Sequence, residues 1–330
     1  MLQVGDIANV AADLAAALGT ENRWESVPAP VAELARSSKL ARLVDLPRRA
    51  LATRAGVKAA LAANRPDVVH LHWARYAPFI DVGGIPLVVH VHGSDARFRG
   101  SSPAGRLVAR SLRRAAAVLV STPDLLEHVP PGARYLPNPV DVGRFAPGAE
   151  AHPSAGVAPV GGEGRPVVFL FARLTAIKGA EQLVAVASAI RSADPSIRVQ
   201  AISGGPFDAE AAAVGVELLA PRARDELVDV IRGADVVVGQ QRLGILSLSE
   251  LEAMSCARPV VMPLREDLYA LRVPVVVAPR TGDVADACVA LLADPRRRVD
   301  IGERARRYVS DHHGPAVVAR QLVELYESIV

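Results

Sequence analysis

Two basic residues, Arg173 and Lys178, stand where an apolar strand-like run gives way to a helix. The run is PVVFLF at 166–171, and the helix is expected to begin near Gly179. The first N–H groups of a helix lack partners and its dipole favours an anion, so two cations there predict a phosphate site. Lys178 is one of three lysines in an arginine-rich chain, and lysine provides a compact point charge. The alternative interpretation is a pair of solvated loop cations.

Histidines occur in two His-x-His pairs at the ends of expected buried strands, His70 with His72 and His90 with His92. Alternation along a strand places the members of each pair on one face of the sheet. A metal site is one interpretation, because imidazole is a common ligand, although only Asp95 supplies a carboxylate at a matching strand end. The preferred interpretation is that His92 contacts a substrate where the strand opens into a loop, and that the other three are hydrogen-bonded structural residues.

Length and composition indicate a globular chain of two domains. The 330 residues are 50% hydrophobic and 22% charged, which excludes a disordered chain. Few aromatic residues interleave with basic ones, which argues against a single-stranded nucleic-acid binder. No apolar run approaches the roughly 18 to 20 residues of a membrane span, and the N-terminus lacks the order of a secretory signal. Because Cys256 and Cys288 form no disulfide or metal spacing, a cytoplasmic location is expected.

Basic residues are concentrated in the first part of the chain. Residues 1–148 contain 18 Lys or Arg against 12 Asp or Glu, and the remainder contains 20 against 23, so the net charges are +6 and −3. Much of the excess lies in 36–65 and 97–114. These segments are either solvated helix faces or a patch for an anionic acceptor or a lipid surface, which would allow peripheral membrane contact.

Short apolar runs alternate with helical patterns along the whole chain. In the first part we predict strands at 1–4, 67–72, 86–92, 117–121 and 135–141, and helices at 10–18, 31–65 with a break at Pro47, and 107–116. A stretch rich in Gly, Pro and Ala at 146–166 predicts a linker. Beyond it we predict strands at 167–172, 197–203, 216–219, 234–239 and 259–262, and helices at 179–191, 224–233, 248–257 and from Pro315 to the end. This alternation predicts an α/β protein with two doubly wound parallel sheets and a cleft between them.

In order, the motifs resemble those of the family-4 retaining glycosyltransferases over nearly the whole chain. They are VGDIANVAADLAAAL, DVVHLHW, VVHVHGSD, YLPNPVDVGRFAP, FARLTAIKGAEQL, the turn at 204–206 and SELEAMSCARPVV. The resemblance implies the GT-B fold of two facing Rossmann-like domains. It places an acceptor-side domain at 1–148, a linker at 149–166, a nucleotide-sugar domain at 167–312, and a helix at 313–330 that crosses back to the first domain.

The resemblance also assigns roles to residues that bind the donor. The family residues matching Arg173 and Lys178 neutralise the donor diphosphate, which is the leaving group. The residue matching Glu252 accepts hydrogen bonds from the ribose hydroxyls, a task that suits a carboxylate. The residue matching His92 contacts the donor sugar.

Further residues are expected to line the ligands. The resemblance implies that glycines at Gly5, Gly204 and Gly205 let the backbone approach them. On the acceptor side we expect His72, Asp95 and Asn138.

The implied activity is transfer of a sugar from a nucleoside-diphosphate sugar to an acceptor hydroxyl with retention of configuration. No metal or other cofactor is expected, because two cations and a helix dipole supply the counter-charge. The acceptor would be a small molecule or a hydroxyl linked to a lipid or polysaccharide. The base and sugar of the donor stay open.

One departure from the family pattern concerns the transferred sugar. The family commonly has a Glu eight positions before the one matching Glu252, and this chain has Gly244 there. Glu250 does not replace it from the same helix face, because residues two apart point to different sides. Gly244 and the residues up to Ser249 could instead supply backbone N–H groups to the phosphate or the sugar. Gly244 and Glu250 are therefore expected among the donor-binding residues. The alternatives are a catalytically silent partner protein, a nucleotide-sugar epimerase or phosphorylase on the same fold, and a metal hydrolase using the histidine pairs.

Overall fold

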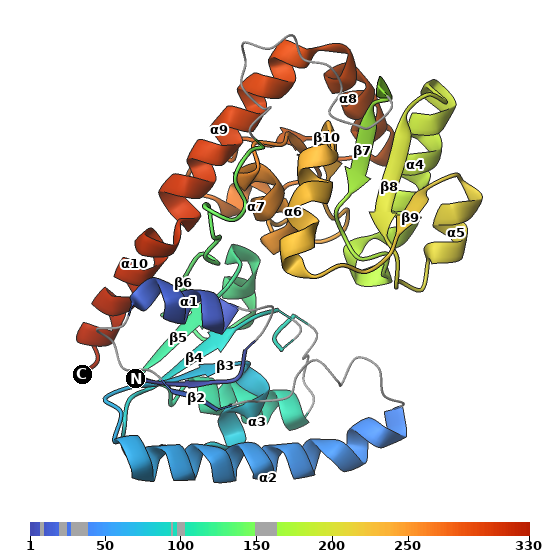
Figure 1. The fold of residues 1–330 in the computed structure, drawn as a ribbon. Helices are drawn as coiled ribbons and strands as arrows, with labels where there is room; N and C mark the ends of the chain where they lie inside the picture. Colours follow the sequence, from blue (N-terminus) through green and yellow to red (C-terminus); the bar gives the residue numbers. More distant parts are fainter. Residues whose placement is uncertain (7–9, 20–24, 28–38, 94, 98–102, 149–163) are drawn as a thin grey trace. The chain divides into compact units, whose positions relative to one another are not determined.

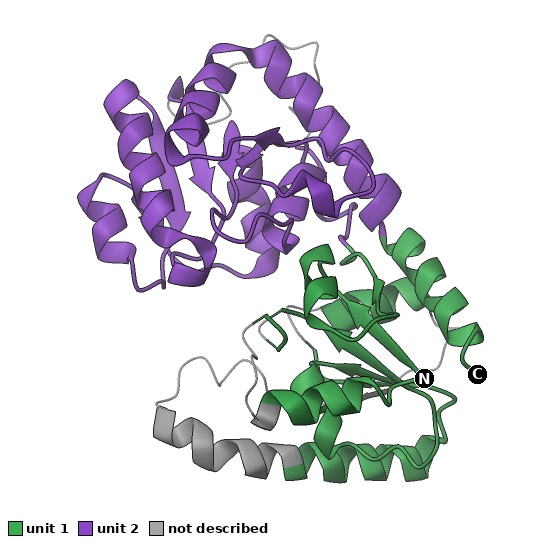
Figure 2. Cartoon of the chain, turned by 180° about the vertical axis from the view of Figure 1, so that it is seen from behind, with its two compact units in different colours: residues 1–139, 315–330 green, residues 140–314 purple. Residues whose placement is uncertain are grey.

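The computed structural model describes residues 1–6, 10–19, 25–27, 39–93, 95–97, 103–148 and 164–330. These residues form two compact units, coloured separately in Figure 2. Unit 1 comprises Met1–Pro139 and Pro315–Val330, and unit 2 comprises Val140–Gly314. The last 16 residues therefore belong to the same unit as the first ones. The linker expected at 149–166 lies outside the described residues, apart from 164–166.

Unit 1 is built on a parallel sheet of six strands in the order β2-β1-β3-β4-β5-β6 (Figure 1). The strands are β1 (Leu2–Val4), β2 (Glu25–Val27), β3 (Val69–His72), β4 (Leu87–Val91), β5 (Ala117–Val120) and β6 (Arg134–Tyr135). All described pairings are parallel, so the chain returns by a crossover between successive strands.

Helices cover both faces of this sheet, and the two faces differ in polarity. Helices α2 (Lys39–Asn64) and α3 (Pro103–Leu112) lie on one face, and α1 (Val10–Leu18) and α10 (Pro315–Glu327) pack side by side on the other (Figure 1). The face under α2 and α3 is apolar, with buried residues such as Val69 and Val89. The alternate positions of β1, β3 and the end of β4 are polar, and they are Gln3, His70, His72, His90 and His92.

Helix α2 continues through Pro47, where we expected a break. A proline in a helix interior removes a hydrogen bond and costs about 3 kcal/mol or more. The helix has 26 residues, and its later turns bury Thr53, Val57 and Ala60, which offsets the local loss. Residues 31–38 of the expected helical segment lie outside the described residues.

Unit 2 contains a second parallel sheet of six strands, in the order β12-β11-β10-β7-β8-β9. The strands are β7 (Val167–Leu170), β8 (Arg198–Ile202), β9 (Glu217–Leu219), β10 (Val236–Val238), β11 (Val260–Met262) and β12 (Val276–Val277). Counted from β7, this is the strand order 3-2-1-4-5-6 of Rossmann folds, which reverses between β7 and β10. Open α/β sheets bind ligands at the carboxyl ends of the strands beside such a reversal. The segments after β7 and β10 are therefore expected to bind the ligand.

Two apolar clusters hold the helices of unit 2 on the two faces of its sheet. Helices α4 (Ala180–Ala193) and α8 (Thr281–Ala293) pack on the face that carries Val168 and Leu170. Helices α6 (Arg224–Gly233), α7 (Leu248–Ser255) and α9 (Pro295–His313) pack on the face that carries Val167 and Phe169. The predicted alternation of strands and helices is confirmed, whereas β2, β12, α8 and α9 have no counterpart among the elements we predicted.

Candidate functional site

The segments that follow β7 and β10 are joined by backbone contacts. After β7 a 3-10 turn, η5 (Ala176–Lys178), leads through Gly179 into α4. Gln241 N, after β10, donates to Lys178 O at 2.9 Å. Gly179 has φ +79°, and a Cβ there would lie 2.9 Å from Cβ of Gln241, so this close approach requires glycine.

Lys178 projects to the beginning of α7. Its Nζ lies 3.4 Å from Oγ of Ser247, the N-cap residue of that helix. The arrangement brings a cation to a helix N-terminus, where the helix dipole favours an anion. Arg173 lies in the segment after β7 and is exposed. Lys178 therefore lies next to two helix N-termini, because it directly precedes Gly179, the N-cap of α4, and reaches the N-cap of α7.

The Glu250 carboxylate is hydrogen-bonded to the residues that begin α7 and to the loop before it. It is fully buried, and one carboxylate oxygen accepts from Gln240 N at 2.8 Å. The other oxygen accepts from Ser247 N at 2.8 Å and from the Ser247 hydroxyl. Glu250 was expected to bind the donor, and its placement favours a supporting role for the loop between β10 and α7.

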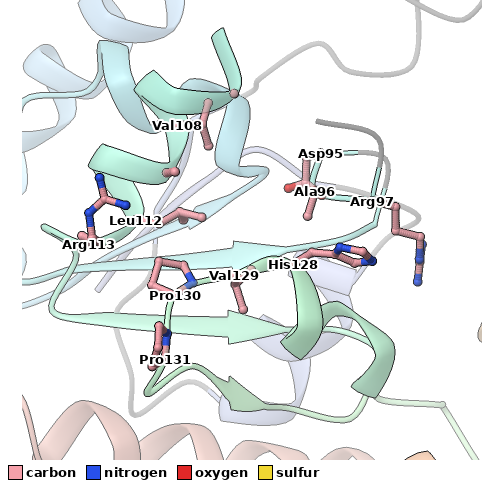
Figure 3. Close-up of a pocket in the computed structure, with 12 residues that line it drawn as sticks. Asp95, Ala96, Arg97, Val108, Leu112, Arg113, His128, Val129, Pro130 and Pro131 are labelled. Carbon is pink, nitrogen blue, oxygen red and sulfur yellow. The ribbon is translucent and has the colours of Figure 1, made fainter. Parts of the chain in front are cut away.

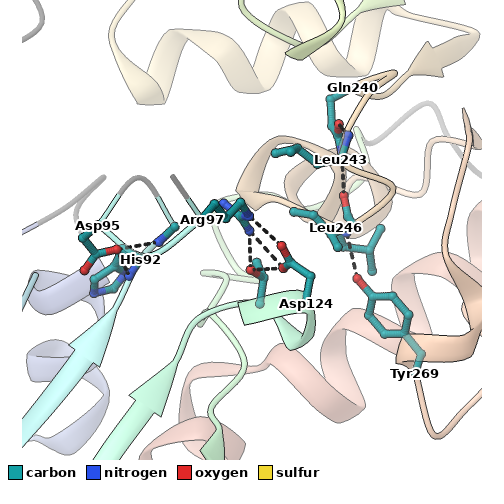
Figure 4. A network of polar contacts seen from close by, with 11 residues as sticks. His92, Asp95, Arg97, Asp124, Gln240, Leu243, Leu246 and Tyr269 are labelled. Atoms are coloured by element: carbon teal, nitrogen blue, oxygen red, sulfur yellow. Dashed lines mark hydrogen bonds and ion pairs between the residues drawn. The ribbon is translucent and has the colours of Figure 1, made fainter. Parts of the chain in front are cut away.

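The loop around Gly244 is braced from both sides (Figure 4). The buried Gln240 side chain accepts from Leu243 N at 2.7 Å and donates to Ile245 O at 2.8 Å. The Tyr269 hydroxyl accepts from Leu246 N at 2.8 Å. Gly244 itself has φ +66°, and a Cβ there would lie 3.0 Å from Cγ of Arg265. The backbone at 244 is therefore unfavourable for a side chain, which fits the absence of the carboxylate that the family commonly has.

Glu252, the expected ribose-binding residue, forms an ion pair. Arg224 Nε, from α6, donates to Glu252 Oε1 at 2.9 Å, and both side chains are largely buried. The Arg224 guanidinium also stacks over the ring of Phe145 at 5.3 Å. One carboxylate oxygen of Glu252 is therefore held in a fixed direction by a neighbouring cation.

The turn after β8 is shaped by two glycines and an aspartate. Asp208, the first residue of α5 (Asp208–Ala213), accepts from Gly204 N at 2.7 Å and from Gly205 N at 3.1 Å. A Cβ at Gly205 would lie 2.5 Å from Leu174 O, in the segment after β7. Glycine at 205 thus lets the β8 turn pack directly on the segment that carries Arg173.

In unit 1, Asp95 ties the ends of β3 and β4 together. Its fully buried carboxylate accepts from Ala74 N at 2.8 Å, from His92 N at 3.0 Å and from Gly93 N at 2.8 Å. Trp73, just after β3, has φ 97°, an uncommon conformation that such a clamp can hold. Asp95 was expected on the acceptor side, and in the structure it shapes the backbone of that edge.

Three other predicted residues of unit 1 lie at the same edge of its sheet or near it. Gly5 follows β1 with φ 79°, and Asp6 beside it accepts from Ala11 N at 2.9 Å in α1. Asn138 is buried, and its side chain donates to Ser121 O after β5. His72 is fully buried at the end of β3.

His92 is half-buried and turns back toward the other histidines. Its Nε2 lies 3.0 Å from Nδ1 of His72, and its ring packs on that of His90 at 4.3 Å between centroids. Burial lowers the pKa of His92 to about 3, so the ring is neutral at physiological pH. A neutral His92 can exchange hydrogen bonds with a ligand but provides no positive charge for it.

A buried ion pair follows the end of β4 and was not expected from sequence (Figure 4). Arg97 Nη2 donates to Asp124 at 2.9 Å and to the Thr122 hydroxyl at 2.7 Å. Burial of Asp124 raises the pKa of its carboxyl, but the hydrogen bonds from Arg97 and Thr122 outweigh burial and hold that pKa below its usual value. The pair fixes Arg97 beside the strand ends.

A cavity of about 390 Å³ opens next to this pair in unit 1 (Figure 3). Val108 and Leu112 of α3 form one apolar wall, and Val129 to Pro131 form another. Arg113 and His128 add polar groups. Of the residues expected to act on the acceptor side, Asp95 lines this cavity.

Comparison with known proteins identifies the family. The profile of the family described as "Glycosyl transferase 4-like domain" matches residues 9–142, and one described as "Glycosyl transferase-like" matches residues 183–324. Together they cover more than half of the chain. A relative named D-inositol 3-phosphate glycosyltransferase, from Saccharomonospora viridis, is 27% identical over 80% of this chain and 71% of its own length. This chain is a GT4-like glycosyltransferase.

Solved structures show that the glycosyltransferase has the predicted GT-B fold. Sucrose-phosphate synthase from Thermosynechococcus elongatus aligns with a TM-score of 0.73 and 16% identity, over 99% of this chain and 98% of that one. Anabaena HepE in complex with UDP-glucose aligns with a TM-score of 0.71 and 16% identity, over 99% of each chain. At such identities the likeness concerns the fold.

The structure adds residues to the candidate site of the glycosyltransferase that were not predicted from sequence. Arg224, Asp208 and Gln240 each bind a predicted site residue or its loop, and in unit 1 Arg97 and Asp124 bind each other close to the predicted residue Asp95. No sequence signal marks these residues, because each is of a type that is common on protein surfaces. Only the fold shows which partner each of them binds.

None of the described helices is long and apolar enough to cross a membrane.

Proposed function

We propose that this glycosyltransferase transfers a sugar from a nucleoside-diphosphate sugar to an acceptor hydroxyl with retention of anomeric configuration, and that the transfer step uses no metal ion. The observation that carries the proposal is the position of Lys178, with its Nζ 3.4 Å from the N-cap hydroxyl of α7. A lysine, a helix N-terminus and the nearby Arg173 together suit a diphosphate, whose charge they would balance in place of a metal.

These cations would act on the leaving group. As the bond from the anomeric carbon to the diphosphate oxygen breaks, negative charge grows on the diphosphate, where Lys178 and Arg173 stabilise it. The acceptor oxygen bonds to the anomeric carbon from the same face. Its proton passes to an oxygen of the leaving diphosphate, so every atom is accounted for without a further reactant.

Glu252 would bind the ribose of the donor. Arg224 holds Oε1 at 2.9 Å and so orients the carboxylate, which would accept hydrogen bonds from ribose hydroxyls. The turn at Gly204 and Gly205 supports a donor site at these strand ends, because the backbone at Gly205 packs closely on the segment after β7.

Relatives and structural neighbours suggest which substrates to try first. HepE, whose fold matches, was solved with UDP-glucose, and the relatives are named for D-inositol 3-phosphate. We therefore propose a uridine-diphosphate sugar as donor and a phosphorylated polyol, or another anionic hydroxyl compound, as acceptor. The basic excess in 36–65 and 97–114 supports an anionic acceptor, in solution or at a lipid surface. Two free buried cysteines support action in the cytoplasm.

A catalytically silent protein that binds nucleotide sugars is the second candidate, and Gly244 favours it. The positive φ and the neighbouring Arg265 leave little room there for a side chain that reads the sugar. The two candidates share the donor site and differ in turnover.

The test is a thermal-shift panel of UDP, GDP, ADP and TDP, alone and as sugar conjugates, on the wild type and on Lys178→Ala. A ligand at 100 times its dissociation constant adds about 2.7 kcal/mol to the stability of the folded state. We expect one base to produce a shift that Lys178→Ala abolishes. Lys58→Ala is the matched control, because Lys58 is an exposed lysine of α2 in unit 1.

A measurement of catalytic turnover distinguishes the transferase from the catalytically silent binding protein. Incubation of the wild type with the bound donor and a panel of phosphorylated polyols should release the nucleoside diphosphate and form a product whose anomeric configuration, read by NMR, equals that of the donor. Binding without turnover would favour the silent protein. An inverted product, or turnover lost on chelation and restored by a divalent ion, would contradict the proposed mechanism.

A further inference from the structure

Four histidines form one layer inside unit 1, between its sheet and the helices α1 and α10. His72 of β3 pairs in register with His90 of β4, and His70 and His92 stand two residues away on the same face. His70, His72 and His90 are fully buried. A His-x-His pair on one strand and a histidine on the next strand can present three imidazoles to one point.

The outer nitrogens of two of these rings already have partners. Nδ1 of His70 lies 2.6 Å from the hydroxyl of Tyr326 in α10, and Nδ1 of His72 lies 3.0 Å from Nε2 of His92. Both contacts are satisfied when Nδ1 carries the proton of the neutral ring. That tautomer leaves a lone pair on Nε2 of His70 and of His72. It is the pattern of histidines that bind metals, whose second nitrogen is fixed by a hydrogen bond.

The other ring nitrogens of His70, His72 and His90 have no hydrogen-bond partner within the described part of the chain. They are Nε2 of His70, Nε2 of His72, and both nitrogens of His90. A buried polar atom without a partner costs about 1–3 kcal/mol, so a cluster of them indicates a ligand that the protein atoms do not provide.

One nitrogen from each of His70, His72 and His90 lies within 4.8 Å of the others. Tetrahedral zinc with bonds of about 2.0–2.1 Å needs nitrogens about 3.4 Å apart, so side-chain rotations that bring them closer by up to about 1.4 Å complete the set. The rings of His70 and His72 are nearly parallel, at 19°, and one of them has to turn for both lone pairs to meet the ion.

We propose that His70, His72 and His90 bind a zinc ion inside unit 1, and that the ion stabilises the packing of α10 on the sheet. Three neutral imidazoles suit zinc and other late first-row metals, whereas magnesium and calcium prefer oxygen. The fourth ligand would be a water molecule. The Gln3 amide, which pairs in register with His70 and has no partner among the described residues, is placed to bind that water.

A zinc ion held by these three histidines would be structural and would take no part in the proposed transfer step. The site lies inside unit 1, and the proposed phosphate site lies in unit 2, so a structural zinc ion is compatible with a transfer step that uses no metal.

The test is metal binding by protein without an affinity tag. The protein is stripped with a chelator, dialysed and titrated with Co²⁺, whose visible bands report tetrahedral coordination, and zinc is then counted after equilibration with Zn²⁺. We expect one ion per chain. His90→Gln should weaken binding more than about 100-fold, and Tyr326→Phe, which removes only the partner of His70, by about 10- to 100-fold. His128→Gln, an exposed histidine of unit 1, should bind as the wild type does.

Two results would overturn the proposal. One is a wild type that takes up no Co²⁺ or Zn²⁺, which would mean that buried water molecules satisfy the imidazoles. The other is a folded His90→Gln protein that binds the ion as tightly as the wild type. If circular dichroism shows that His90→Gln does not fold, Tyr326→Phe decides, and unchanged affinity in that variant counts against the site.

Discussion

The ion pair of Arg224 and Glu252 leads to a prediction about how the enzyme recognises ribose. If Arg224 directs the Glu252 carboxylate, Arg224→Ala should weaken nucleotide binding by about 1.5–3 kcal/mol, roughly 10- to 100-fold, the range for a hydrogen bond to a charged group. The loss should be smaller for the corresponding 2′-deoxy or 3′-deoxy nucleotide, because those lack a hydroxyl that Glu252 binds. Calorimetric titration measures both. Arg222→Ala, an exposed arginine two residues away, is the control. An equal loss for ribose and deoxyribose would show that Arg224 does not act through Glu252.

At the scale of single residues, the sequence identified charged groups but not their partners. Arg173 and Lys178 could be proposed from the sequence because two cations beside a strand end already suggest an anion site. The bond between Arg224 and Glu252 joins residues 28 positions apart, and the bond between His70 and Tyr326 joins residues 256 apart. Such pairs follow from the order of strands in a sheet, which alternating apolar runs do not determine.

The turn from β8 to α5 leads to a prediction about an element. Gly205→Ala would place a Cβ 2.5 Å from Leu174 O, so the turn or the segment after β7 has to move. We expect a loss of about 1–3 kcal/mol in stability, as for other overpacked sites, and weaker nucleotide binding, because that segment carries Arg173 and Lys178. Urea denaturation and a thermal-shift titration measure the two effects.

A second glycine provides the control for that prediction. A methyl group on Gly282, in α8, would have no atom within 4 Å, and alanine favours helices. Gly282→Ala should therefore leave stability unchanged or raise it by up to about 1 kcal/mol. If Gly205→Ala behaves like Gly282→Ala, the turn is not packed as tightly as the structure indicates.

The existence of most elements could be predicted from sequence, and their ends could be placed only approximately. Apolar runs bounded by Gly or Pro predicted β7, β8 and β10, because a buried strand needs apolar residues and the turns at its ends favour Gly and Pro. The break expected at Pro47 was wrong, since local preference gave way to the packing of the later turns of α2. Helix α9 has many arginines, and its buried face, with Ala305 and Val309, is too narrow to stand out in the sequence.

On the scale of the whole molecule, the division into two units predicts how unfolding is distributed. Leu322 of α10 is fully buried in unit 1, although it lies close to the C-terminus. Leu322→Ala should cost about 2–5 kcal/mol, and the cost should fall on unit 1, because the apolar contacts of α10 with α1 are lost. Leu291→Ala, at a buried position of α8, should lower the stability of unit 2 by a comparable amount.

Calorimetry with and without the donor nucleotide distinguishes the units, since two compact units need not unfold in one transition. A nucleotide that binds the segments after β7 and β10 stabilises unit 2, so the transition that it raises belongs to unit 2. Leu322→Ala should lower the other transition, and Leu291→Ala the one that the nucleotide raises. If Leu322→Ala lowered only the nucleotide-sensitive transition, α10 would contribute its stability to unit 2. If both variants lowered a single shared transition equally, the two units would unfold as one cooperative body.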